Sequence, residues 1–128
     1  MGTSIKVGPT PWSWGALGSA DALCQQAEAA ESMGFHSFWL PENHFGERGV
    51  IPSPLILLAA VAARTRSIRL GTTSYLLPIR PPLLAAEDVA VLDQLSGGRL
   101  SLAPTPKAVN IPADNPLPTP SIKRPPLS

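Results

Sequence analysis

The chain has 128 residues, of which 44% are hydrophobic, so it can bury the core of one ordinary domain. Its net charge of +1 and its lack of a basic patch indicate no nucleic-acid partner, and its longest apolar stretch, 55–63, is too short to span a membrane. The single cysteine, Cys24, excludes an internal disulfide and a cysteine-based zinc site. This single cysteine and an N-terminus that lacks the apolar core of a signal peptide favour a cytoplasmic protein. We expect no membrane partner and no bound metal.

Strand-like and helix-like segments alternate in the first half of the chain. Residues 4–7 are a short β-prone run that ends at a Gly-Pro pair. A helix is predicted over 19–33, because Ser19 is a favourable N-cap residue and apolar side chains then recur at helical spacing up to a glycine. The next run, 36–40, predicts a strand that ends at a proline.

The same alternation continues in the second half. A Ser-Pro pair predicts a helix that starts at residue 54 and runs to about residue 66. Residues 68–72 predict a strand with 75–77 as its continuation, and 83–95 predict a helix that ends at Ser-Gly-Gly. A fourth strand begins over 99–102.

This order of elements predicts right-handed βαβ units and a parallel sheet with helices on its faces. Two architectures satisfy it, a doubly wound open sheet and a (β/α)₈ barrel. The first strand is not followed by the Gly-x-Gly-x-x-Gly pattern of a dinucleotide-binding Rossmann unit. Composition and periodicity alone leave both architectures open.

The composition changes near residue 103. Eight of the sixteen prolines lie in 104–128, a segment without glycine or aromatic residues. We therefore expect one domain over 1–103 and a disordered, proline-rich tail over 104–128. Such a change is typical of a shifted reading frame; alternatively, PLPTP and IKRPPL are ligand motifs in the polyproline II conformation.

Polar and aromatic side chains gather at one edge of the expected sheet. In either parallel fold, ligands bind at the C-terminal ends of the strands. The loop after the first strand carries Trp12 and Trp14, and the sequence PENHF over 41–45 follows the second strand. Hydroxyl groups at 72–74 mark the end of the third strand. We expect these groups to line the mouth of a pocket.

Each of these residues also has a structural explanation. The carboxylate of Glu42 would hold a neighbouring loop through backbone N–H groups, and Asn43 would tolerate an unusual backbone angle at the bend. A lone histidine such as His44 is more often a structural residue than a catalytic one. The residue types alone therefore do not decide between these roles.

Three stretches in this order carry a resemblance to a known family: GFHSFWLPENHF, SPLILLAAVAARTRSIRLGT and YLLPIRPPLLAAEDVAVLDQLSGGRL. Over about 100 residues the chain resembles the N-terminal part of the bacterial luciferase-like flavin-dependent monooxygenases. The resemblance implies an α/β chain with parallel strands that forms part of a (β/α)₈ TIM barrel, about three and a half βα units of it. It also implies reduced FMN, or the deazaflavin F420, at the barrel mouth.

The resemblance implies partners and site residues as well. An oxidoreductase of this family takes O₂ and a small organic substrate, and a flavin reductase supplies its electrons. Luciferase has Glu-His-His-Phe where this chain has Glu42, Asn43, His44 and Phe45, so Asn43 stands at the position of the catalytic histidine. Glu42, Asn43 and His44 are therefore the candidate catalytic residues.

The candidate cofactor-binding residues come from other loops. The family has a non-proline cis peptide at the end of the third strand, which matches Thr72, Thr73 and Ser74 and predicts a cis bond between the last two. Glu87 matches an acidic residue near the flavin edge in relatives. Trp12 joins this group because it follows the first strand at the same edge.

The chain departs from the family after SGGRL. The family continues into a glycine-rich Gly-x-Gly-Arg-Gly segment that helps to hold the flavin phosphate, whereas this chain continues with SLAPTPKAVN. An open half-barrel also exposes unpaired strand edges and apolar side chains, so we expect the chain to be marginally stable alone, to form a homodimer or not to fold uniquely. The alternative to a monooxygenase is thus a catalytically inactive half-barrel remnant or an assembly module that binds no flavin.

Overall fold

The computed structural model describes residues 4–11, 19–45 and 50–105, and the predicted tail from residue 106 onward lies outside these ranges. Helices and strands alternate along them. The elements are α1 (Ala20–Ser32), β1 (Ser37–Leu40), α2 (Pro54–Arg64), β2 (Arg69–Leu76), a 3₁₀ turn η2 (Leu77–Ile79), α3 (Pro82–Leu95) and β3 (Leu100–Thr105). The three helices and the last three strands predicted from the sequence are confirmed, and β3 continues two residues past position 103.

The expected first strand over 4–7 is wrong, since the structure has no strand there. The segment nevertheless runs beside β1, because the Val7 and Pro9 carbonyls accept hydrogen bonds from His36 N and Trp39 N, both at 2.9 Å. Pro9 has no N–H to donate, so it cannot contribute a donor to a continuous ladder.

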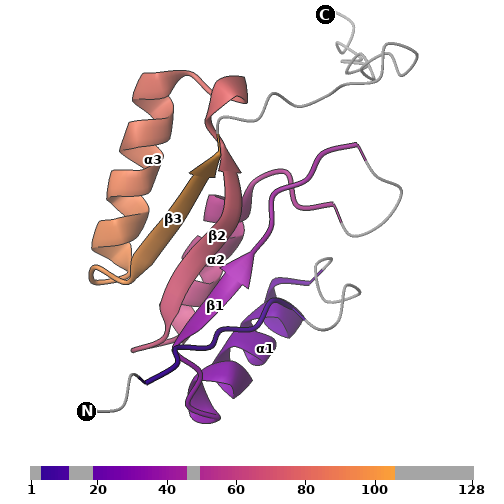
Figure 1. Cartoon of the computed structure of the whole chain (residues 1–128), viewed down its shortest axis with the longest axis vertical. Helices are drawn as coiled ribbons and strands as arrows, with labels where there is room; N and C mark the ends of the chain where they lie inside the picture. The colour runs from indigo at the N-terminus through magenta and orange to yellow at the C-terminus, as the bar shows by residue number, and fades with distance from the viewer. Residues whose placement is uncertain (1–3, 12–18, 46–49, 106–128) are drawn as a thin grey trace, which may run out of the picture.

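The sheet is parallel and has the order β1-β2-β3, with Leu40 opposite Thr72 and Thr72 opposite Leu102. The register shifts between Thr73 and Tyr75, which marks a bulge near the end of β2. The three arrowheads point the same way, and the segments that follow β1 and β2 leave from that end (Figure 1). The predicted parallel arrangement is therefore confirmed.

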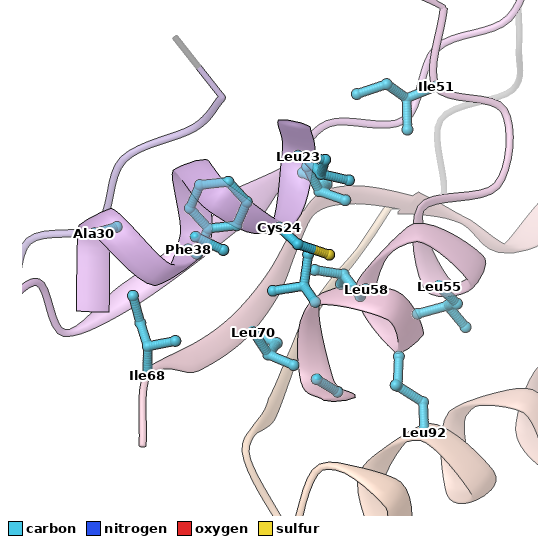
Figure 2. Close-up of a cluster of buried hydrophobic side chains, with 14 of the residues drawn as sticks. Leu23, Cys24, Ala30, Phe38, Ile51, Leu55, Leu58, Ile68, Leu70 and Leu92 are labelled. Carbon is cyan, nitrogen blue, oxygen red and sulfur yellow. The ribbon is translucent and has the colours of Figure 1, made fainter. Parts of the chain in front are cut away.

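The hydrophobic core lies between one face of the sheet and the helices. Phe38, Leu40 and Leu70 point from the strands into this layer and are fully buried. Side chains of α1, α2 and α3 meet them there, among them Leu23, Leu58 and Leu92 (Figure 2). Full burial of each large side chain contributes roughly 1.5–3 kcal/mol, so this layer supplies the main stabilisation of the fold.

The side chain of Trp39 packs on the opposite face of the sheet. Its ring lies so close to Gly71 that an added Cβ at that glycine would overlap it, and Gly8 approaches the other side of the indole. The indole Nε1–H donates to Ser37 Oγ at 2.8 Å. Because side chains alternate along strands, this face carries Ser37, Trp39 and Gly71, while their neighbours enter the core.

Two side chains secure the edge of the sheet where the strands begin. The carboxylate of Glu31 accepts hydrogen bonds from the backbone N–H groups of residues 66–68, at 2.7–3.1 Å. The guanidinium of Arg99 reaches back to the C-terminal end of α2, where it donates to the Ala62 and Thr65 carbonyls. The hydrogen bonds of Glu31 and Arg99 at this edge thus stabilise the fold.

Candidate functional site

The loops after β1 and β2 meet at the C-terminal edge of the sheet, as predicted. Leu40 and Thr72 are register partners, and Leu76 N donates a hydrogen bond of 2.8 Å to Glu42 Oε2. The corner over 42–45 and the kink over 72–74 therefore lie on one side of the molecule. Trp12 and Trp14 lie outside the described residues, so their part in this edge stays a prediction.

Glu42 is the centre of a buried polar cluster. Its side chain has no exposed surface, and one oxygen lies 2.8 Å from His44 Nε2 and 2.7 Å from Arg80 Nη1. The other oxygen accepts from Leu76 N and from Arg80 Nη1 at 3.0 Å. The expectation that Glu42 holds a neighbouring loop through a backbone N–H is confirmed.

Arg80 balances the charge of this buried carboxylate. The same guanidinium donates to Leu76 O at 2.8 Å and to Pro52 O at 3.3 Å, and its central carbon lies 4.2 Å from the centre of the Tyr75 ring. Burial raises the pKa of the Tyr75 phenol, and the Arg80 charge partly opposes that shift. An unpaired buried carboxylate would be strongly unfavourable, so Arg80 is required for Glu42 to stay buried.

Asn43 and His44 have different surroundings. Asn43 Oδ1 accepts a hydrogen bond from Ile51 N at 2.6 Å, and Asn43 N donates to Ile51 O, so the residue closes the loop between them. The His44 side chain is 19% exposed and presents its Nε2 to Glu42. Phe45 has a φ of 59° and an exposed ring. Asn43 is exposed and His44 is half-buried, so both of these candidate catalytic residues retain access to the edge, whereas Glu42 does not.

The predicted cis peptide between Thr73 and Ser74 is confirmed. Thr73 is exposed, Ser74 is half-buried and Thr72 is fully buried. Thr72 Oγ1 has no hydrogen-bond partner within the described part of the chain. The three hydroxyl groups thus sit in different environments, and Thr73 presents the most accessible one.

Glu87 is not joined to this cluster. It is exposed on α3, and no hydrogen bond or ion pair described in the structure connects it to the residues at the ends of β1 and β2.

Sequence reasoning did not identify Arg80 and Trp39 as residues of this part of the structure. The signal available for Arg80 was a single basic residue between apolar and proline neighbours in LPIRPP, directly after a strand and matched in charge by Glu42.

The residues at the C-terminal edge of the sheet are better suited to one part of a flavin than to another. A cis peptide beside an exposed hydroxyl offers backbone and side-chain groups to the edge of a flat ring. Within residues 4–11, 19–45 and 50–105, Arg80 is the basic residue at this edge, and its guanidinium is engaged by Glu42. A nearby groove of about 490 Å³, lined by apolar side chains such as Leu77, Val89 and Leu102, offers a phosphate no partner. The described residues therefore fit the ring and not the phosphate.

The parallel sheet, its helices and the polar edge where the strands end are those of part of a (β/α)₈ barrel. The sequence profile of the family described as luciferase-like monooxygenase matches residues 1–103, and the chain belongs to that family. The predicted membership is confirmed.

Individual relatives agree with this assignment. The alkanal monooxygenase alpha chain of the Kryptophanaron alfredi symbiont is 39% identical over 77 residues, which are 60% of this chain and 22% of that protein. The oxygenating constituent of 3,6-diketocamphane monooxygenase from Pseudomonas putida, solved in complex with FMN, is 28% identical with a TM-score of 0.73. Coenzyme F420-dependent tetrahydromethanopterin reductase from Methanopyrus kandleri is 26% identical with a TM-score of 0.63.

The likeness covers most of this chain and a minor part of each relative. It extends over 83% of this chain and 30% of the Pseudomonas putida structure, and over 82% and 27% in the Methanopyrus kandleri case. The chain thus spans about a third or less of the relatives that it matches. Within the described ranges, no helix combines the length and the apolar character needed to cross a membrane.

Proposed function

We propose that this chain contributes part of the flavin site of a monooxygenase that acts on a small organic substrate with reduced FMN and O₂. The observation that carries the proposal is the cis Thr73–Ser74 peptide at the same sheet edge as the Glu42–His44 pair. The FMN complex among the structural relatives favours FMN, and the F420-dependent relative keeps the deazaflavin as the alternative.

The residues at this edge would have different roles in the proposed site. Thr73, Ser74 and their peptide would hold the edge of the flavin ring, with Trp12 and Glu87 as further cofactor contacts. His44 would exchange a proton with the ligand, and Glu42 and Asn43 would hold the loop that carries it. When bound, reduced flavin supplies the electrons that activate O₂, and a flavin reductase in the cytoplasm would restore them.

A specific observation also supports a second candidate function, an assembly module without flavin. The described residues offer no free cation to a phosphate at this edge, and apolar side chains lie exposed on the helices, among them Ile56 at 73% and Leu95 at 68%. Such a surface favours self-association. A homodimer is compatible with both functions, so oligomeric state alone does not separate them.

Flavin titration separates the two functions. We expect the full chain to quench FMN fluorescence in a saturable manner, with F420 titrated in parallel. Thr73→Ala should weaken FMN binding about tenfold, which corresponds to the loss of one hydrogen bond. Ser32→Ala, an exposed hydroxyl at the end of α1, is the matched control and should leave binding unchanged. Absence of quenching with either cofactor, together with a defined oligomer by light scattering, would support the assembly module.

A further inference from the structure

The contact between His44 and Glu42 decides which imidazole nitrogen carries the proton. His44 Nε2 lies 2.8 Å from Glu42 Oε1, and an ionised carboxylate can only accept hydrogen bonds. Nε2 must therefore be the donor. In a neutral imidazole one nitrogen carries the proton and the other is an acceptor, so Nδ1 is left as the acceptor.

The Glu42 carboxylate that imposes this tautomer is itself held in place by hydrogen bonds. Leu76 N and Arg80 Nη1 hold its second oxygen at 2.8 and 3.0 Å, and Arg80 also reaches the first oxygen at 2.7 Å. The guanidinium in turn is anchored on the Leu76 carbonyl. Arg80 and His44 therefore bind the same carboxylate, which is held at both of its oxygens.

We propose that Arg80 and Glu42 are positioning residues which hold His44 as the Nε2–H tautomer and leave Nδ1 as its proton acceptor. Among the described residues, no hydrogen bond to Nδ1 is found, and the side chain is 19% exposed. The functional meaning rests on the proposed flavin site: there, His44 would accept a proton from a ligand at Nδ1, and Glu42 would stabilise the imidazolium that results.

The tautomer can be measured in the free protein, without flavin. The sequence has two histidines, so long-range proton–nitrogen correlation spectra of chain labelled with ¹⁵N-histidine contain few signals, and His36→Gln assigns them. At about pH 9 imidazole is ordinarily neutral. We expect a protonated Nε2 and an unprotonated Nδ1 for His44. A protonated Nδ1, or a ring that exchanges between both forms, would overturn the proposal.

Variants then test the part played by Arg80. Arg80→Met removes the group that holds the Glu42 carboxylate in place. The population of the Nδ1–H form should rise about fivefold, the change expected when the misplaced carboxylate weakens its hydrogen bond from Nε2–H by about 1 kcal/mol. Arg80→Lys retains the charge and should restore most of the Nε2–H form. Arg64→Met is the matched control, since Arg64 pairs with Glu28 and Asp21 on the surface.

The outcomes separate this inference from the proposed function. An unchanged His44 spectrum in a folded Arg80→Met protein would refute the role of Arg80, whatever the flavin titration gives. If Arg80→Met does not fold by circular dichroism, the wild-type tautomer and Arg80→Lys still decide. An Nε2–H tautomer in a chain that binds neither FMN nor F420 would support the positioning role and refute the proposed function.

Discussion

Arg99 offers the sharpest test of how the fold is held together. Its guanidinium makes five hydrogen bonds of 2.6–3.2 Å, to Ser96 O, Thr65 Oγ1, Ile68 O, Ala62 O and Thr65 O. It thereby joins the turn before β3 to the C-terminal end of α2 and to the start of β2. We predict that Arg99→Ala destabilises the chain severely.

The magnitude follows from what the substitution leaves behind. Hydrogen bonds from a charged group contribute roughly 1.5–3 kcal/mol each, but five bonds of one side chain are far from additive. Truncation would leave buried carbonyl groups without their donor, and comparable losses of a buried network reach about 3–4 kcal/mol. The free energy of unfolding of a native protein is about 5–15 kcal/mol, so Arg99 would account for a large fraction of it.

Urea unfolding followed by tryptophan fluorescence and circular dichroism measures the effect. Arg66→Ala is the matched control, because Arg66 is exposed and its described hydrogen bonds come from its backbone N–H. It should change the free energy of unfolding by less than about 0.5 kcal/mol. Arg99→Lys should fall between the two, since a single ammonium cannot reach all five acceptors. A loss below about 1 kcal/mol in Arg99→Ala would refute the reasoning.

Three other substitutions test different contacts by the same unfolding assay. Burial raises the pKa of Glu31, but hydrogen bonds from the N–H groups of residues 66–68 lower it more, so the pKa lies below its ordinary value of 4.5. The stability that this carboxylate contributes should therefore be lost as pH falls below 4.5. Glu31→Gln should show a smaller loss over that range, and an equal loss would place the acid sensitivity elsewhere. Gly71→Ala forces a methyl group into the Trp39 ring and should cost about 1–3 kcal/mol, a loss that Trp39→Leu in the same chain should partly relieve. Thr72→Val removes a buried hydroxyl without a described partner and should be neutral or stabilising by up to about 2 kcal/mol, whereas a clear loss would reveal a hydrogen bond at Oγ1.

Periodicity and end signals predicted the helices well because they act locally. Ser19 caps α1 through Ala22 N, and Gly34 follows that helix with a φ of 83°, as their residue types indicate. The end of α2 was placed at about residue 66, but the helix ends at Arg64. Thr65 adopts an extended backbone, with φ at −114° and ψ at 163°, and its hydroxyl bonds to Val61 O. That ending depends on tertiary contacts with Arg99, which local patterns do not contain.

The shared edge of the site was predictable for a topological reason. Parallel strands place their C-terminal ends together, so the loops that follow β1 and β2 had to meet once the strand order was known. The contact between Glu42 and Arg80 was not predictable in this way. It joins residues that are 38 positions apart, through one carboxylate and one guanidinium whose directions depend on how the bulge and the 3₁₀ turn are built.

That contact changes which residues can act on a ligand. Glu42 was a candidate catalytic residue because an acid stood at the end of a strand, yet its carboxylate has no exposed surface and is held by three neighbours. Asn43, at the position of the family's catalytic histidine, uses its side-chain oxygen on Ile51 N. Asn43 is nevertheless exposed and His44 is half-buried, so a ligand at this edge would meet Asn43, His44 and Thr73 before Glu42. The contact with Glu42 explains why His44 points where it does, and so removal of this buried acid should alter the chemistry of His44.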